Sequence, residues 1–485
     1  LKPVVLAMFG LSLASGAAMA SGGQKYNQEL AKMQNQLQNL QSRVNAMSSS
    51  SVAQSGGHSS LANLVTMNQT FSQSMMSSAM PMGKAYRLIA AQQSGKLVPG
   101  GVVLGGQIKG AAGYEIASDG GKNGYVHTIG MNGSSPPPEA VSGIWLDSIK
   151  LGMAAAVNKD VATYIQVGTT SNYNNNANDT KLEVQQAFVT INLQDYLGHV
   201  PVYTFMGKKD IDFGQFDRLT PYSKPVTSIF GSNGDTIGLG YAQQNGQGFS
   251  ATWSLFNGGS GAPTYWYHGK DSSGQPSGLD TPAVSPVFPP APIPAAEQTK
   301  ANYHLNNWAL NLGYDMKVSG LDHLHIGGGF MSAVSQSWKP SSDSDDSPNS
   351  GLDLNVSGKW QNIEMATEYV TTTSEVKGKG STDSGKVYAW NLSGKYGFQM
   401  AGKQSYLSAG YGLVHLPSEN ENGFTTGSQL VLGASQDVMQ NVNLGLEYRY
   451  SNNVVSVGST NGVKGLVANN DKKDSTFLAV LTTGF

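Results

Sequence analysis

Residues 102–116 read VVLGGQIKGAAGYEI, and this stretch decides the fold. Apolar or small residues occupy every second position in it, and the positions between them include Gln107, Lys109 and Glu115. Side chains that alternate with a period of two lie on the two opposite faces of a β-strand. The stretch therefore predicts a strand with one apolar and one polar face. The same alternation recurs at 145–157, 308–318 and 442–450.

Sixteen segments of this kind follow one another, and short and long connections alternate between them. The short ones include Asn245-Gly246, a dipeptide that favours a two-residue hairpin turn. An even number of strands with short turns on one side and long loops on the other is typical of outer-membrane barrels, whereas a soluble sandwich would pack its apolar faces together. The sequence therefore predicts an all-β fold, a 16-stranded antiparallel transmembrane β-barrel with a short N-terminal α-helical coiled-coil stalk. The predicted strands are 102–117, 141–157, 161–170, 182–193, 200–209, 236–244, 247–257, 303–318, 322–336, 351–360, 362–374, 386–397, 403–415, 427–438, 440–452 and 475–485, and the predicted long loops are 118–140, 171–181, 210–235, 258–302, 337–350 and 453–474.

Aromatic residues near the strand ends are expected to form the girdles at the two membrane interfaces. The strand count places both ends of the barrel and the stalk on the short-turn side, in the periplasm, and the long loops outside the cell. The predicted girdle residues are Tyr114, Trp145, Tyr164, Trp253, Trp308 and Tyr369.

The composition suits this fold and excludes several other classes of protein. Charged residues are 13% of the 485 residues, where about a quarter is usual, and the hydrophobic fraction of 39% is low for soluble domains of this length. The formal net charge of −2 argues against binding of nucleic acid, which needs a basic surface. The sequence contains no cysteine, which excludes a disulfide framework and cysteine-based metal sites.

Three segments are predicted to precede the barrel at 102–485. Residues 1–20 have a basic start, a short apolar stretch and an A-x-A site, as in a cleaved signal peptide. Residues 21–48 carry apolar side chains at alternating spacings of four and three, the seam of a periplasmic coiled coil. Residues 49–101 are a linker rich in Ser, Met and Gln, in which 86–93 could form a short helix.

The seam predicts a homo-oligomer, expected to be a trimer. The alternative is a single amphipathic helix that lies on a neighbouring domain. The seam residues are Leu30, Met33, Leu37, Leu40 and Val44.

The last predicted strand carries a candidate membrane-assembly signal. Phe477, Leu481 and Phe485 occupy alternate positions of one strand face, and Phe485 is the last residue of the sequence. A terminal aromatic residue preceded by apolar residues at every second position resembles the signal that the barrel-assembly machinery recognises. The resemblance implies that this machinery and the lipid bilayer of the bacterial outer membrane are partners of the chain.

The third predicted long loop, at 210–235, is the candidate selectivity element. Facing charges across a constriction would orient anionic or dipolar solutes, whereas the alternative is that the charges only pair and solvate a loop. GKKDIDFGQ at 207–215, followed by YSKPVT at 222–227, resembles the G-K-x-x-x-x-F-G … D-P-x-T segment of several substrate-specific porins. The match is partial, because Ser-Lys replaces the acidic residue before the proline. In sixteen-stranded porins this loop commonly folds into the lumen and narrows it. The predicted constriction residues are Lys208, Lys209, Asp210, Asp212, Asp217, Arg218 and Lys224.

The whole layout resembles the legiobactin-receptor (LbtU-like) family of siderophore porins of Gram-negative outer membranes. The shared features are the signal peptide, the short heptad helix, the Ser/Met-rich spacer and the sixteen strands. The resemblance implies uptake of an iron–siderophore chelate, a small-molecule solute, without a TonB-type plug and without a cofactor. The alternative is a general porin, or one for another solute such as a sugar, an amino acid or phosphate.

No sequence motif indicates an enzyme, and no metal site is predicted. The nucleophile-elbow, P-loop and zinc-protease motifs are missing from the sequence. His323 and His325 share a strand face and are predicted to line the lumen, where two histidines could bind a metal, but polar lining is the simpler account. The methionines of the linker are interpreted as apolar packing rather than as Cu(I) ligands.

Overall fold

The computed structural model describes residues 65–76, 83–117, 140–170, 181–216, 218–242, 247–256, 269–270, 276–277, 307–334, 349–377, 384–417, 424–460 and 463–485. Contacts divide the chain into two units, residues 1–65 with 399–402 and residues 66–398 with 403–485, and the second unit contains the barrel. The predicted signal peptide and the predicted heptad seam lie outside the described residues and stay predictions.

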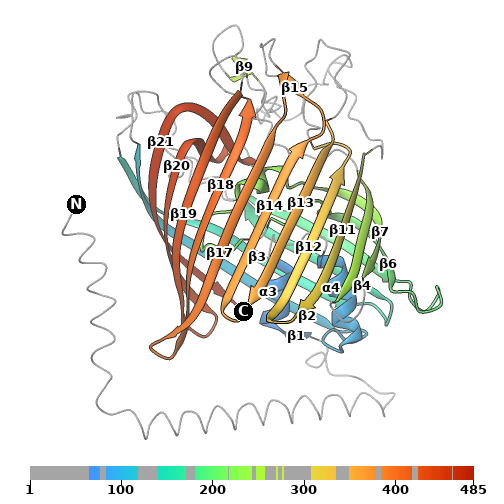
Figure 1. Ribbon diagram of the computed structural model, residues 1–485. Helices are drawn as coiled ribbons and strands as arrows, with labels where there is room; N and C mark the ends of the chain where they lie inside the picture. Colours follow the sequence, from blue (N-terminus) through green and yellow to red (C-terminus); the bar gives the residue numbers. More distant parts are fainter. Residues whose placement is uncertain are drawn as a thin grey trace, which may run out of the picture. The chain divides into compact units, whose positions relative to one another are not determined.

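Sixteen antiparallel strands form a closed barrel (Figure 1). Each strand pairs with the next barrel strand, and β21 pairs back with β2 from Gln107–Gly484 to Ala117–Asp474. The predicted sixteen-stranded antiparallel barrel is therefore confirmed. Its strands are β2 (Val102–Ala117), β3 (Ala140–Ala156), β4 (Val161–Thr170), β5 (Lys181–Asn192), β6 (Val202–Asp210), β7 (Asn233–Ala242), β8 (Gly248–Phe256), β11 (Asn307–Val318), β12 (Leu321–Met331), β13 (Gly351–Trp360), β14 (Ile363–Thr372), β17 (Tyr388–Met400), β18 (Lys403–Pro417), β19 (Phe424–Met439), β20 (Val442–Thr460) and β21 (Val463–Gly484). The other described elements are β1 (Val65–Met67), β9 (Gly269–Lys270), β10 (Pro276–Ser277), β15 (Val376–Lys377), β16 (Ser384–Gly385), α3 (Gln69–Met76), α4 (Gly83–Gln93) and the 3₁₀ helix η2 (Val226–Phe230).

The prediction of a long loop at 453–474 is wrong. β20 continues to Thr460 and β21 begins at Val463, and the two strands stay paired through most of this stretch. The sequence between them, Asn461-Gly462, favours a two-residue hairpin, which lets both strands extend. The two strands are therefore the longest of the described barrel.

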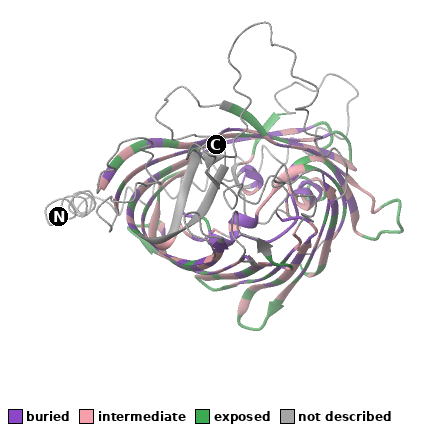
Figure 2. Ribbon diagram, turned by 90° about the horizontal axis from the view of Figure 1, so that it is seen from above, coloured by how far each residue is buried: buried purple, intermediate pink, exposed green. Residues whose placement is uncertain are grey.

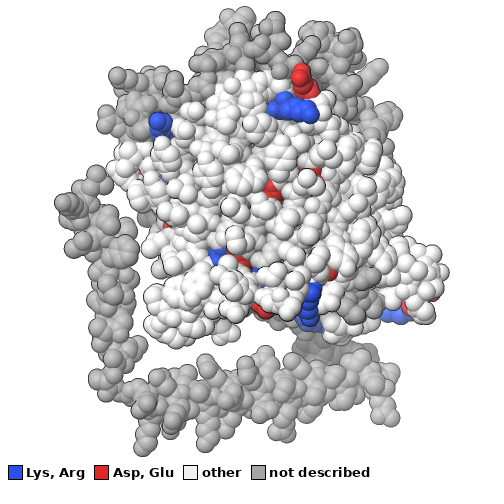
Figure 3. Space-filling model, in the orientation of Figure 1, with Lys and Arg blue, Asp and Glu red and all other residues white. Residues whose placement is uncertain are grey.

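The outer face of the barrel is a band of exposed apolar side chains. Ile144, Leu354 and Leu446 point away from the lumen and are 85%, 66% and 48% exposed. The side of the barrel that Figure 3 shows carries few charged side chains. An apolar exterior and a polar interior are typical of a barrel that spans a membrane.

Two of the six aromatic residues predicted for the girdles face inward instead, because Trp145 is 9% and Tyr164 is 1% exposed. On β3 the reason is a bulge at Asp147, which is skipped in the register with β2. An extra residue moves every following side chain to the other face, so Trp145 lies inside the barrel although Leu151 lies outside. The other four predicted girdle residues, Tyr114, Trp253, Trp308 and Tyr369, are exposed.

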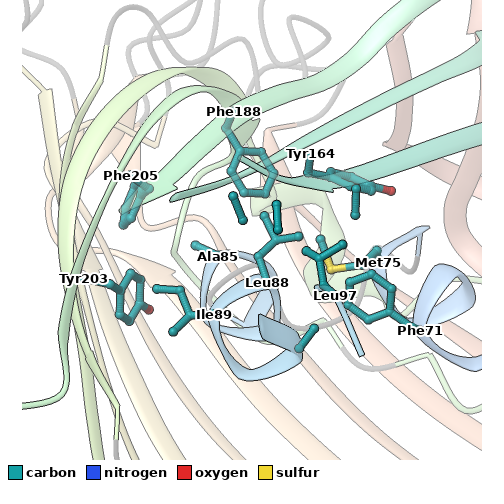
Figure 4. Packing of buried hydrophobic residues seen from close by; sticks show 14 of the residues in the cluster. Phe71, Met75, Ala85, Leu88, Ile89, Leu97, Tyr164, Phe188, Tyr203 and Phe205 are labelled. Carbon is teal, nitrogen blue, oxygen red and sulfur yellow. The ribbon is translucent and has the colours of Figure 1, made fainter. Parts of the chain in front are cut away.

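Two helices fill part of the barrel interior. Ala85, Leu88 and Ile89 of α4 pack with Phe71 and Met75 of α3 against the inner wall (Figure 4). Seen from above, buried segments lie within the ring of strands (Figure 2). Burial of an aliphatic or aromatic side chain contributes about 1.5–3 kcal/mol, so the helices are firmly attached. The wall residues of this cluster include Tyr164 of β4, Phe188 of β5, and Tyr203 and Phe205 of β6.

The helix expected at 86–93 is thus present, but it begins three residues earlier, at Gly83. Met75 and Met76 are 0% and 1% exposed, as apolar packing requires. Within the described parts of the chain, no helix is long and apolar enough to cross a membrane.

Phe485 is paired with the first barrel strand. Its backbone N–H donates a hydrogen bond to the carbonyl oxygen of Gly106 (3.1 Å), and the N–H of Gly106 donates to the carbonyl oxygen of Phe485 (3.0 Å). The Phe485 ring covers Gly106, where a Cβ atom would lie 2.2 Å from the ring. Phe477 and Leu481 are 48% and 49% exposed and share the outer face of β21. The ring therefore packs at the seam where the barrel closes.

Replacing Phe485 by Ala should lower the yield of folded barrel several-fold, because the change removes the ring from the closing seam and from the predicted assembly signal. The heat-dependent mobility shift of the protein in gel electrophoresis measures the folded fraction. Tyr396→Ala is the matched control, since it removes a 48% exposed ring from the outer face of β17. Equal yields of the two variants would contradict a special role for Phe485.

Candidate functional site

The connection between β6 and β7, residues 211–232, lies inside the barrel. Two glycines shape it. Gly207 has a φ of 132°, and a Cβ atom there would lie 2.3 Å from the carbonyl oxygen of Ala187 on β5. Gly214 has a φ of 72°, and a Cβ atom there would lie 2.3 Å from the ring of Phe216. These are the two glycines of the G-K-x-x-x-x-F-G pattern. At both positions the positive φ and the close neighbouring atoms exclude a larger residue.

Apolar side chains fix this loop across the lumen. Phe213, Phe216 and Phe230 are 7% exposed or less and belong to one buried cluster with residues of the wall. Val226 packs against Gly412 of β18, where a Cβ atom would lie 2.5 Å from its side chain. The loop therefore reaches strands far from β6 and β7. The wall residues of the cluster include Phe256 of β8, Ala309 of β11, Met331 of β12, Val370 of β14, Ala389 of β17 and Val414 of β18.

Glu368 of β14 holds the middle of the loop. Its Oε1 accepts hydrogen bonds from the backbone N–H groups of Gln215 (2.6 Å) and Phe216 (3.2 Å), and its Oε2 accepts one from the Thr227 hydroxyl (2.5 Å). The residue is 6% exposed. A buried carboxylate is costly unless donors surround it, and the loop supplies three.

Glu447 of β20 holds the next part of the loop. It accepts hydrogen bonds from the N–H groups of Tyr222 (2.7 Å) and Ser223 (3.0 Å) and from the Ser223 hydroxyl. The Tyr222 hydroxyl donates to Asp147 of β3 (3.0 Å), and the Lys109 ammonium lies 4.5 Å from the centre of the Tyr222 ring. Burial, and then the charge of Asp147, raise the pKa of Tyr222, so the hydroxyl stays a donor. The loop thus has a second set of attachments, to β2, β3 and β20.

Three of the predicted constriction charges pair in the structure. The Lys209 ammonium lies 2.6 Å from Asp212 Oδ1, and the two side chains are 1% and 2% exposed. Burial raises the pKa of Asp212, although Lys209 opposes this effect. Asp210 pairs with Lys84 of α4 at 2.9 Å, which joins the helix to the base of the loop. The predicted site therefore contains two neutralised pairs, one of them completed by a residue from outside the loop.

The structure does not bring Lys208 into the site. Lys208 is exposed, whereas its neighbour Lys209 is buried. Adjacent residues of a strand face opposite sides, so only one of the two can reach the lumen. Lys208 lies on the outer face, opposite Asp235 in the register with β7. Asp217 lies outside the described residues.

Arg218 and Lys224 line a small hollow between the loop and the inner faces of β17, β18 and β19. Lys150 of β3 lies within electrostatic range of both. The Arg218 guanidinium lies 5.8 Å from the centre of the Tyr222 ring, and within the described residues it has no ion pair. Arg218 and Lys224 are called the basic group below.

A larger cavity, of about 230 Å³, lies between α4 and the wall. Asp315 of β11 accepts hydrogen bonds from His325 Nδ1 (2.9 Å) and lies 3.3 Å from His323 Nε2, so both predicted lumen histidines contact one carboxylate. Burial and Asp315 raise the pKa of Tyr86 on α4, which faces this carboxylate across the cavity. In the part of the chain that the structure describes, no group of three His, Asp or Glu side chains is arranged to hold a metal ion.

The comparisons with known proteins find similarity only among solved structures. No family model and no curated protein matches the sequence. OmpT, an outer membrane protein of Vibrio cholerae, is 12% identical, with 79% of this chain and 97% of that chain covered and a TM-score of 0.44. An anion-selective porin from Comamonas acidovorans is 10% identical, with 79% and 99% covered and a TM-score of 0.47. The outer membrane channel DcaP of Acinetobacter baumannii is 14% identical, with 79% and 97% covered and a TM-score of 0.46. TM-scores this low do not establish a relationship to these proteins. The barrel fold follows from the strand pairing.

Several residues of the site are not among those predicted from the sequence. Glu368 and Glu447 hold the loop, and Lys84, Lys109 and Lys150 lie around it. The strand alternation contains a signal that could have found four of them, since a charged residue at an inward position of a strand must have a partner in the lumen. Lys84 lies on a helix inside the lumen, and the strand pattern carries no signal for it.

Replacing Glu368 by Gln should loosen the loop, because an amide keeps the size of the side chain but is a weaker acceptor for the three donors. We expect a cost of about 1–3 kcal/mol for the attachment, faster tryptic cleavage after Arg218 and a higher single-channel conductance. Glu364→Gln is the control on the same strand, since Glu364 is paired with Lys395 away from the loop. Cleavage at the same rate in both variants would show that Glu368 does not hold the loop.

Lowering the pH should make the channel more selective for anions. Because the pKa of Asp212 is raised, this group takes up a proton at a pH above the ordinary aspartate range and leaves the positive charge of Lys209 uncompensated. The reversal potential in a salt gradient, followed from about pH 7 to about pH 4, measures the change. Asp212→Asn should remove this pH dependence, and an unchanged dependence in that variant would assign it to another group.

Proposed function

We propose that this chain is an outer-membrane channel through which a specific small anionic solute diffuses into the periplasm. The observation that carries the proposal is the basic group, Arg218 and Lys224, on a loop that crosses the lumen of a closed barrel. The long loops then face the outside of the cell and the short turns face the periplasm. The chain has no catalytic role in this proposal.

The electrostatic argument depends on where these cations lie. A charge in a narrow, poorly hydrated passage acts more strongly on a solute than the same charge on an open surface. Asp353 and Glu368 lie together on the inner faces of β13 and β14, on another side of the lumen, where burial and mutual repulsion leave at most one negative charge between them. A solute that passes the loop therefore meets a field directed across the channel, which draws anions toward the basic group.

The most specific candidate solute is an iron–siderophore chelate, which the resemblance to the siderophore porins supports. Ferric chelates are commonly anionic, which suits the basic group. The outer-membrane bilayer and the barrel-assembly machinery are the partners in this proposal, and the heptad seam makes the channel a homotrimer.

A porin for other solutes, such as sugars, amino acids or phosphate, is the second candidate. The observation in its favour is that Lys209, Asp210 and Asp212 are neutralised by pairing, which lowers the net charge beside the loop. A weaker field would discriminate less between solutes.

The double substitution Arg218→Glu and Lys224→Glu should shift the reversal potential of single channels in a salt gradient toward cations. It should also reduce uptake of the preferred anionic solute by at least tenfold, since each reversal replaces attraction by repulsion. Lys208→Glu, which changes a lysine on the outer face, is the matched control and should leave both properties nearly unchanged.

A similar shift in both variants would mean that the loop is not the constriction. Uptake in a deletion strain of a ferric chelate, a sugar, an amino acid and phosphate then separates the two candidates. Uptake of the sugar or the amino acid at the rate of the ferric chelate would favour the general porin.

A further inference from the structure

The cavity of about 230 Å³ between α4 and the wall is not lined by the basic group. Its walls come from Tyr86 and Arg87 of α4, from Gln215 of the loop, and from residues of β6, β7, β8, β11, β12 and β13. Tyr203 of β6 and Ala242 of β7 belong both to this wall and to the cluster in which α3 and α4 pack, so the cavity lies directly beside α4. It is smaller than the range of about 300–1,000 Å³ typical of drug-sized ligands, which limits an occupant to a small solute.

One wall of the cavity offers a carboxylate with a free oxygen. Both contacts from His323 and His325 go to Oδ1 of Asp315, and Oδ2 has no hydrogen-bond partner in the described residues. The side chain of Asp315 is 26% exposed, so Oδ2 can meet a solute. A carboxylate oxygen only accepts hydrogen bonds and therefore selects a donor such as a hydroxyl group.

A glycine makes room beside it for two more polar groups. A Cβ atom at Gly327 would lie 2.7 Å from both His325 Nε2 and Asn355 Oδ1, so these atoms share the space that a side chain would occupy. Asn355 is 4% exposed, and its Oδ1 is buried without a hydrogen-bond partner among the described residues. Because His325 contacts Asp315 through Nδ1, its Nε2 atom is on the other edge of the ring. A buried polar atom without a partner is costly, and a bound hydroxyl would satisfy it.

The remaining walls add neutral amides and one cation. Asn311 of β11 and Gln215 of the loop are 5% and 7% exposed and line the cavity. Tyr86 contributes the face of an aromatic ring and a hydroxyl, and Arg87 contributes a guanidinium that also donates to the carbonyl oxygen of Ser74 (2.6 Å). A guanidinium with five N–H donors can hold this contact and still bind a carboxylate.

We propose that the cavity is a binding site for a hydroxylated carboxylate about the size of a sugar acid. The carboxylate pairs with Arg87, and the hydroxyl groups bond to Asp315, Asn311 and Asn355. This inference rests on the proposed function, because an anion that passes the basic group reaches the cavity next. A zwitterionic amino acid such as glycine would also match Arg87 and Asp315, but it has no hydroxyl group for the buried Oδ1 of Asn355, and a site built for hydrogen bonds to hydroxyl groups rejects such a ligand.

Binding to the purified, detergent-solubilised protein tests the site without depending on conduction. Ligand-observed NMR titrations with D-gluconate, D-glucose and glycine as probes should show that gluconate binds at least tenfold more tightly than the other two. Asp315→Asn should weaken gluconate binding roughly tenfold, the effect of losing one hydrogen bond to a charged group. Asp322→Asn, on an exposed position of β12, is the matched control and should bind gluconate like the parent protein.

Asn311→Ala is a second variant and should also weaken gluconate binding, with the folded state of each variant checked by the heat-dependent gel shift. Gluconate binding that is equal in Asp315→Asn and Asp322→Asn would overturn the proposal, and so would tighter binding of glycine or glucose than of gluconate. Planar-bilayer recordings of the parent protein are the separate test of the channel. A channel that prefers cations contradicts the proposed function, whereas loss of gluconate discrimination in the titrations contradicts only the cavity site.

Discussion

The structure depends on one constraint, that every backbone N–H and C=O group of the wall must find a partner within the sheet. A membrane offers no water to these groups, so an open sheet edge would be costly there. Pairing of β21 with β2 removes the last edge, and Phe485 extends this pairing to Gly106. Closure in turn fixes which side chains face the lumen, because strand alternation leaves no other choice once the register is set.

Closure also creates a lumen wide enough to need filling, and the chain fills it with its own segments. The loop at 211–232 crosses the interior, held by an apolar cluster and by Glu368 and Glu447. α3 and α4 occupy the side next to β2–β7. The pair of Lys84 with Asp210 joins α4 to the base of the loop, so the two lumen segments support one another. The cavity beside α4 and the hollow next to the basic group lie between these segments and the wall.

Charge pairing decides which residues of the lumen are left for solutes. Lys209 and Asp212 compensate one another inside the wall, and their burial leaves little of either charge for a solute. Arg218 lies outside these pairs, with Tyr222 beside it. In the proposed channel, selectivity therefore depends on the few charges that the folded loop does not neutralise, rather than on the number of charged residues in the loop sequence.

The sequence by itself determined the barrel, its sixteen strands and the position of the third loop along the chain, because a period of two and turn signals such as Asn245-Gly246 are local properties. Tertiary structure decided the rest. The bulge at Asp147 turned Trp145 inward, and no alternation pattern locates an extra residue before the partner strand is known. The contacts of Lys84 with Asp210 and of Glu368 with Gln215 join residues 126 and 153 positions apart, and such partners meet only when the closed barrel brings its opposite sides to one loop.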